Sequence, residues 1–66
     1  MSTVTVRGYA IPQYIYTAVV QLWDGGIYSE PYIASEIYRL YNYNLSSDFV
    51  WHILRMSARM QKNEAW

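Results

Sequence analysis

Residues 28–62 decide how this chain folds, and they read YSEPYIASEIYRLYNYNLSSDFVWHILRMSARMQK. Apolar residues recur there at helical spacing, which predicts two helices, Glu30–Tyr41 and Ser46–Lys62. A short polar turn, Asn42-Tyr43-Asn44, separates them, because asparagine tolerates left-handed backbone geometry and bonds to its own backbone. We expect this pair of helices to organise the whole domain.

The second of these helices has two contrasting faces when its residues are placed about 100° apart. Ser46 is its predicted N-cap. The apolar face, expected to be buried, holds Phe49, Val50, Ile53, Leu54 and Met60. The opposite face is mostly basic and holds Asp48, His52, Arg55, Arg59 and Lys62. We therefore expect a buried stripe and, facing away from it, a basic ridge that is free to bind a partner.

The N-terminal part of the chain predicts a strand and a helix. β-branched residues alternate over Thr3–Val6, which is typical of a short strand. Such a strand needs a neighbour, and the candidates are Ile27-Tyr28 and Ala65-Trp66. A helix is expected over Pro12–Asp24, because proline suits a first helical turn. Gly25-Gly26 should end it, since glycine takes the left-handed conformation at little cost.

The predicted helix Pro12–Asp24 is apolar around most of its girth. Its core face comprises Ile11, Ile15, Ala18, Val19 and Leu22. Tyr16, Val20 and Trp23 widen the apolar arc beyond a single stripe. A helix of this kind is usually covered on two sides, so the second cover is either the N-terminal strand or a second copy of the chain. This pattern favours a homodimer.

Composition narrows the classes of protein to which the chain can belong. Its 66 residues allow one domain, 1–66, and the lack of cysteine excludes disulfides and a thiolate zinc site. With a single histidine we expect no metal site, and we expect no cofactor. No apolar run reaches the length of about 18 residues that spans a bilayer. Residues Met1–Arg7 lack the features of a signal peptide, so we expect a cytoplasmic protein without membrane contact.

Aromatic residues make up 18% of the chain, whereas charged residues make up 15% with a net charge of zero. A domain this small cannot bury eight tyrosines, and tyrosine is common at protein interfaces. This composition favours a protein partner or self-association. The alternative is an aromatic core with half-exposed rings. The tyrosines expected to be available to a partner are Tyr14, Tyr28, Tyr32, Tyr38 and Tyr43.

Catalysis is not expected. Asp48 and His52 are four residues apart and can meet on one helix face, as in the base and orienting residue of a catalytic triad. A nucleophile and the room for a cleft are both missing, so we interpret the pair as a surface ion pair. The chain is therefore predicted to be no enzyme and to have no small-molecule substrate.

Two segments resemble the winged helix-turn-helix family. Ile33–Leu40 is similar to that family's second helix, and Leu45–Met56 matches its recognition-helix pattern L-S-x-x-x-V-x-x-x-L. The resemblance covers roughly Pro12 to Met60. It implies a mainly α fold with a three-helix helix-turn-helix core and a short N-terminal β-strand. Because the sequence stops at Trp66, the β-hairpin wing of the family would be truncated.

The resemblance implies a small DNA-binding accessory protein or transcription regulator that uses its last helix for recognition. Arg55 would donate paired hydrogen bonds to the edge of a guanine base. Asp48 and the zero net charge depart from the usual pattern of DNA-binding proteins, which neutralise phosphates with basic residues. The recognition residues would be Ser47, Trp51, His52, Arg55, Arg59 and Lys62. The alternative is a protein-binding module or inhibitor of a host machine, without nucleic-acid binding, similar to small phage or mobile-element proteins.

Overall fold

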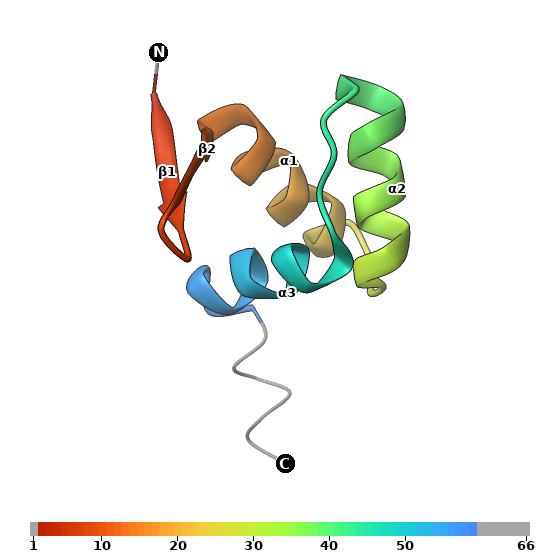
Figure 1. Ribbon diagram of the computed structural model, residues 1–66. Coiled ribbons are helices and arrows are strands. Elements are labelled where there is room, and N and C mark those ends of the chain that lie inside the picture. Colours follow the sequence, from red (N-terminus) through yellow and green to blue (C-terminus); the bar gives the residue numbers. More distant parts are fainter. Residues whose placement is uncertain (1, 60–66) are drawn as a thin grey trace.

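A β-hairpin precedes three helices in the computed structural model, which describes residues 2–59 (Figure 1). The predicted mainly helical domain is therefore confirmed, and it carries a small two-stranded antiparallel sheet. The elements, in chain order, are β1 (Thr3–Val6), β2 (Tyr9–Pro12), α1 (Gln13–Asp24), α2 (Glu30–Tyr41) and α3 (Ser47–Met56). Within residues 2–59, no helix combines the length and the apolar character that crossing a bilayer requires.

The strand β1 forms as predicted, but its partner is β2, so the expected pairing with Ile27-Tyr28 is wrong. The other proposed partner, Ala65-Trp66, lies outside the described residues. Arg7 and Gly8 connect the strands with φ angles of 53° and 83°. Two positive φ angles define a type I′ turn, whose twist matches that of a hairpin. An arginine is rarely found at such an angle, so no residue pattern predicted this turn.

Each helix ends at a residue with left-handed backbone geometry. Gly26 follows α1 with φ of 106°, which confirms the predicted glycine stop. The backbone N–H groups of Gly26 and Ile27 bond to the carbonyls of Trp23 and Leu22 at 3.0 and 3.2 Å. This pair of hydrogen bonds is a Schellman motif. Asn42 ends α2 in the same conformation, with φ of 55°.

The last helix is shorter than predicted. The helix expected over Ser46–Lys62 ends at Met56, because Ala58 takes the left-handed conformation with φ of 70°. The N–H groups of Ala58 and Arg59 then bond to the carbonyls of Arg55 and Leu54 at 3.0 and 2.9 Å. This is a second Schellman motif, formed without glycine. Arg59 therefore lies beyond the helix rather than on its surface.

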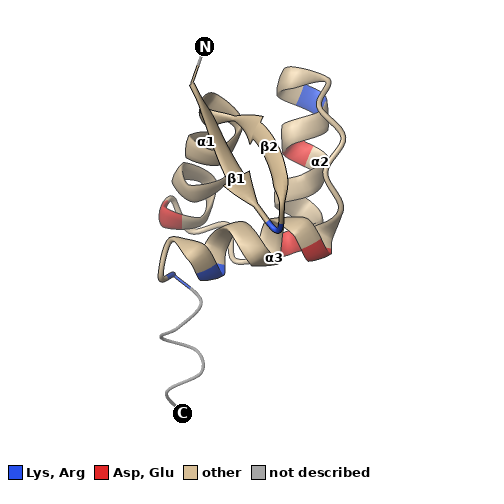
Figure 2. Cartoon of the chain, turned by 60° about the vertical axis from the view of Figure 1, so that its left-hand side comes forward, with Lys and Arg blue, Asp and Glu red and all other residues tan. Residues whose placement is uncertain are grey.

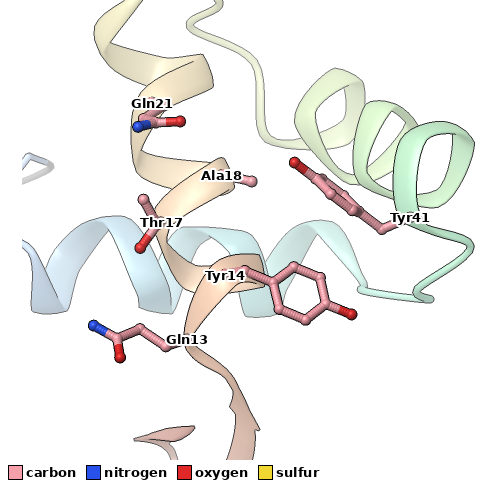
Figure 3. A pocket seen from close by; sticks show the side chains of 6 residues that line it. All are labelled: Gln13, Tyr14, Thr17, Ala18, Gln21 and Tyr41. Carbon is pink, nitrogen blue, oxygen red and sulfur yellow. The ribbon is translucent and has the colours of Figure 1, made fainter. Parts of the chain in front are cut away.

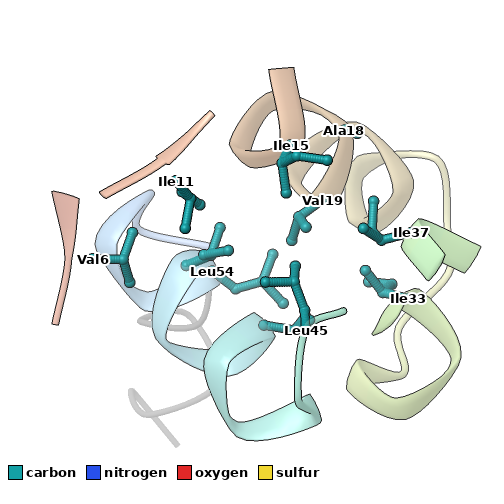
Figure 4. Packing of buried hydrophobic residues seen from close by; sticks show 11 residues of the cluster. Val6, Ile11, Ile15, Ala18, Val19, Ile33, Ile37, Leu45 and Leu54 are labelled. Carbon is teal, nitrogen blue, oxygen red and sulfur yellow. The ribbon is translucent and has the colours of Figure 1, made fainter. Parts of the chain in front are cut away.

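The side chains of all five elements meet in one apolar core (Figure 4). Ile11, which the helical spacing places on the first helix, is a β2 residue and is buried in the core together with Val6 of β1. Each fully buried aliphatic side chain contributes roughly 1.5–3 kcal/mol. The buried residues are Val6, Ile11, Ile15, Ala18, Val19, Ile33, Ile37, Leu45, Val50, Ile53 and Leu54.

The helical spacing of Ile33, Ile37, Leu40 and Tyr41 predicts a shared core face on α2, but Leu40 and Tyr41 are exposed instead. Leu40 and Tyr41 expose 51% and 43% of their surface, whereas Ile33 and Ile37 are buried. In Figure 1, α3 crosses near the start of α2, and the end of α2 lies away from it. The last turn of α2 therefore lacks the cover that its first two turns receive.

The two faces predicted for the last helix are reproduced in part. Val50, Ile53 and Leu54 are buried and Phe49 is half-buried, while Met60 lies outside the described residues.

The wide apolar arc of α1 is partly covered within the chain. Both strands of the hairpin pack against α1, and Tyr16, Val20 and Trp23 are half-buried against the core. The N-terminal hairpin is thus at least part of the second cover that the sequence requires.

Candidate functional site

The exposed face of α3 is the first candidate site. Ser46 begins this helix by accepting a hydrogen bond from the backbone N–H of Phe49 at 3.1 Å, as the capping pattern predicts. The predicted nucleic-acid-binding residues do not form one continuous ridge. Ser47 and Arg55 are exposed, Trp51 and His52 are half-buried, Arg59 lies beyond the helix, and Lys62 lies outside the described residues.

The basic groups near α3 are held by neighbouring side chains. Arg55 lies over the Trp51 ring, 5.3 Å from its centroid, in a cation–π contact. Arg59 binds Asp24 at the end of α1 through two hydrogen bonds of 2.8 and 3.2 Å. The hydrogen bond to Asp24 raises the pKa of Arg59, so this guanidinium is charged at any working pH. The ion pair between Arg59 and Asp24 connects the segment after α3 to the end of α1.

The hairpin contributes a residue to this face that the sequence analysis missed. Nη1 of Arg7, at the hairpin tip, lies 2.6 Å from Nε2 of His52. The predicted pairing of Asp48 with His52 is also present, at 3.5 Å between Oδ2 and Nε2. No local pattern could have revealed Arg7 as the closer partner, because it comes from the opposite end of the chain.

Charges are balanced over the described part of the chain. Five basic and five acidic residues in the sequence, less Lys62 and Glu64, leave four of each sign in residues 2–59. Figure 2 shows blue and red positions spread over the hairpin and all three helices. The Asp48 side chain is 79% exposed at the start of α3, where it would repel a phosphate. The charged residues are Arg7, Arg39, Arg55 and Arg59, against Asp24, Glu30, Glu36 and Asp48.

The tyrosines form the second candidate site. Four of the five predicted contact tyrosines are exposed, and Tyr43 is half-buried. Tyr9 and Tyr41 are also exposed, and the sequence analysis did not single them out for this role. The exposed aromatic surface is therefore wider than expected. The exposed members of the predicted set are Tyr14, Tyr28, Tyr32 and Tyr38.

Tyr14 of α1 and Tyr41 of α2 line a cleft between the two helices (Figure 3). Their ring centroids are 5.4 Å apart and the rings are tilted by 58°. The cleft has a volume of about 430 Å³, and none of its lining residues is charged. We call it the tyrosine cleft; it is lined by Gln13, Tyr14, Thr17, Ala18, Gln21 and Tyr41.

The tyrosine cleft offers both hydrogen-bonding groups and apolar area. Its amide and hydroxyl groups both donate and accept hydrogen bonds, and the two rings offer apolar area. Figure 3 shows Tyr41 projecting from α2 toward Ala18, whose small side chain leaves the cleft open. Among residues 2–59, no three histidine, aspartate or glutamate side chains lie close enough together to hold a metal ion.

A second, smaller groove of about 330 Å³ runs beside the strand β2. The ring of Tyr9 on β2 meets the ring of Phe49 on α3 edge to face, with centroids 6.2 Å apart. We call it the β2 groove; it is lined by Tyr9, Ala10, Ile11, Tyr43, Asn44, Leu45, Ser46 and Phe49. Its lining residues are also uncharged, so neither groove is built to select a charged ligand.

Comparison of the chain with protein-family models, with curated proteins and with solved structures finds no match.

Proposed function

We propose that this protein is a protein-binding module that docks its partner on the tyrosine cleft. The observation that carries the proposal is the pair of exposed rings, Tyr14 and Tyr41, beside an uncharged cleft. Tyr38, one turn before Tyr41 on α2, is exposed as well and widens the aromatic surface. Tyrosine is enriched in interfaces, and charged residues are depleted at their centres.

The partner surface that fits this cleft combines apolar area with hydrogen-bonding groups. Tyrosine rings lose little conformational entropy on binding and bring a hydroxyl group to the rim. Buried aromatic anchors of this kind commonly contribute about 2 kcal/mol or more to a complex. A second copy of the chain meets the same requirements, so homodimerisation is one form of the proposed activity.

A photo-crosslinking experiment tests this proposal. p-Benzoylphenylalanine replaces Tyr41 in one variant and Tyr28 in the other, and each is irradiated in nuclease-treated extract of the cells that produce the protein. Both tyrosines are exposed, but Tyr41 is the last residue of α2 whereas Tyr28 precedes this helix, which is about 18 Å long. We expect a specific adduct from position 41 and none of the same mass from position 28. An adduct of twice the chain mass identifies a second copy.

Competition supplies the control for that experiment. Unlabelled wild-type protein and the Tyr28→Ala variant should suppress the adduct equally, whereas Tyr14→Ala should require roughly ten times the concentration, as expected for loss of an interface anchor. Equal adducts from both positions, or a Tyr14→Ala variant that competes as well as wild type, would remove the tyrosine cleft as the binding surface.

A second candidate function is DNA binding by a helix-turn-helix formed by α2, the turn at Asn42 and α3. One observation favours it: the hairpin tip places Arg7 beside α3, where it adds a cation to the face that carries Arg55. The hairpin would then serve as a wing on the N-terminal side of the helices. Balanced charge and the exposed Asp48 side chain favour protein binding over this candidate.

Salt dependence decides between the two candidates. DNA binding through Arg7 and Arg55 predicts that log K for a labelled random duplex falls with log [salt], with a slope of about −2. Arg7→Ala and Arg55→Ala should each reduce the slope by about 1. Arg39→Ala is the matched control, because Arg39 pairs with Glu36 on α2. Absence of binding at low salt would remove DNA binding from consideration.

A further inference from the structure

Among residues 2–59, no strand pairs with the outer edge of β2, so its backbone groups there are available for pairing. A two-residue turn closes the hairpin, so Val6 and Tyr9 form a hydrogen-bonded pair, and pairs along an antiparallel ladder alternate in type. Thr5 and Ala10 are therefore a non-hydrogen-bonded pair. The N–H and C=O groups of both residues therefore point away from the partner strand. Those of Ala10 lie along the free edge of β2. Pro12 has no N–H, so it ends the row of donors.

This edge opens into the β2 groove rather than onto a flat surface. The segment Tyr43–Ser46 forms the opposite wall, between α2 and α3. Ile11 and Leu45, which are 3% and 9% exposed, lie at the base of the groove together with half-buried Phe49. Ala10 is exposed and carries only a methyl group, so a second backbone can approach its N–H closely. The groove thus combines an unpaired strand edge with an apolar base.

We propose that the β2 groove binds one extended segment of a partner protein, which adds to β2 as a third strand. Backbone hydrogen bonds to Ala10 would hold the segment, and alternate side chains would enter the groove. Because no charged residue lines the groove, the entering side chains are aliphatic or aromatic. This site lies apart from the tyrosine cleft and goes beyond the proposed function.

The far wall of the groove selects a single strand over a second copy of the hairpin. A strand that pairs with β2 lies about 4.8 Å from it. If a second copy paired its hairpin with β2, the other strand of that hairpin would lie about 4.8 Å further from β2 in the plane of the sheet. The segment Tyr43–Ser46 lies on that side of β2. A helix is also disfavoured, because its backbone groups are internally paired and cannot bond to Ala10.

The test uses a neutral heptapeptide of alternating valine and threonine, blocked at both ends, as the probe. It is titrated into the full chain while backbone amides are followed by NMR and by hydrogen exchange. We expect shifts at Ala10, Ile11 and Leu45, and slower exchange of the Ala10 amide. The Thr5 amide is the internal control, because it faces outward on the opposite edge of the sheet and should stay unprotected.

Two proline variants complete the test. Ala10→Pro removes the N–H that would bond to the peptide and should weaken binding about tenfold, because a carbonyl is left unpaired. Thr5→Pro removes the equivalent outward N–H of β1 and should leave the affinity within about twofold. If Ala10→Pro does not fold, exchange of the wild-type Ala10 amide decides the question. Tyr14→Ala should leave peptide binding unchanged, so this proposal and the tyrosine cleft can fail separately.

Three results would overturn the proposal. The first is no shift at Ala10 with millimolar peptide, and the second is equal protection of the Thr5 and Ala10 amides. The third is a dimer, detected by light scattering, that the Ala10→Pro substitution dissociates. That result would assign the edge of β2 to a second copy of the chain instead of a single peptide strand.

Discussion

Nη1 of Arg7 lies 2.6 Å from Nε2 of His52, although the two residues are 45 positions apart in the sequence. A guanidinium can only donate, so Nε2 accepts and the proton of the neutral imidazole is on Nδ1. The carboxylate of Asp48 lies 3.5 Å from the same nitrogen. His52 therefore has two competing partners, a donor that suits its neutral form and an acceptor that suits its protonated form.

Removing the acceptor of Arg7 should loosen the tip of the hairpin. His52→Ala deletes Nε2, the atom that accepts from Nη1 of Arg7. His52→Gln is the matched control, because its side-chain carbonyl can still accept from the guanidinium. We expect the NMR resonances of Arg7 and Gly8 to move in His52→Ala and to stay near their wild-type positions in His52→Gln. Equal changes in both variants would contradict this role of the Nε2 acceptor.

The Glu36–Arg39 pair should stabilise α2 only while the carboxylate is charged. The hydrogen bond from Arg39 lowers the pKa of Glu36 from its ordinary value of 4.5. A group whose pKa is lowered by folding contributes stability above its unfolded pKa and loses it as the pH falls through the folded pKa. Glu36→Gln should therefore lower the urea midpoint at pH 7, by a margin that shrinks below about pH 4.5. An Arg39→Ala background should abolish this pH dependence.

Core and exposed positions on α2 should differ sharply in their response to truncation. Ile37 is fully buried, and Ile37→Ala should cost about 3 kcal/mol because it leaves a cavity. Leu40 is 51% exposed on the same helix, and Leu40→Ala should cost less than about 0.5 kcal/mol. Denaturant unfolding of the two variants measures both values. Similar losses would show that the end of α2 is covered after all.

The N-cap of α3 offers a matched pair of serines. The side chain of Ser46 accepts from the backbone N–H of Phe49, whereas Ser47 is the exposed first residue of the helix. Ser46→Ala should lower the free energy of unfolding by about 1 kcal/mol, and Ser47→Ala should change it by less than about half of that. A loss at Ser47 equal to that at Ser46 would place the cap one residue later.

Capping residues predicted the helix ends well, because they act on backbone groups only a few residues away. Ser46, Gly26 and Asn42 all mark the helix ends that their chemistry indicates. The end of α3 could not be found in this way, because Ala58 carries no such signal. Its left-handed geometry accompanies the ion pair between Arg59 and Asp24, which depends on tertiary packing.

Composition predicted that tyrosines would be exposed at the candidate sites, but not which of them would lie together. Exposure of Tyr14 and Tyr38 follows from the number of tyrosines and their positions on the helices. The partnership of Tyr14 with Tyr41 depends on how α1 packs against α2, and the helical pattern had placed Tyr41 in the core. The β2 groove was missed because its first wall, the hairpin strand β2, was missed.

The packing of β1 against α3 has a consequence for the speed of folding. The other contacts between elements mostly join segments that are neighbours in the chain, such as the two strands of the hairpin or α2 and α3. Such local pairs form within microseconds, but docking the first strand on the last helix must close a loop of some forty residues. We expect that closure, reported by Val6 and Leu54, to govern the folding rate.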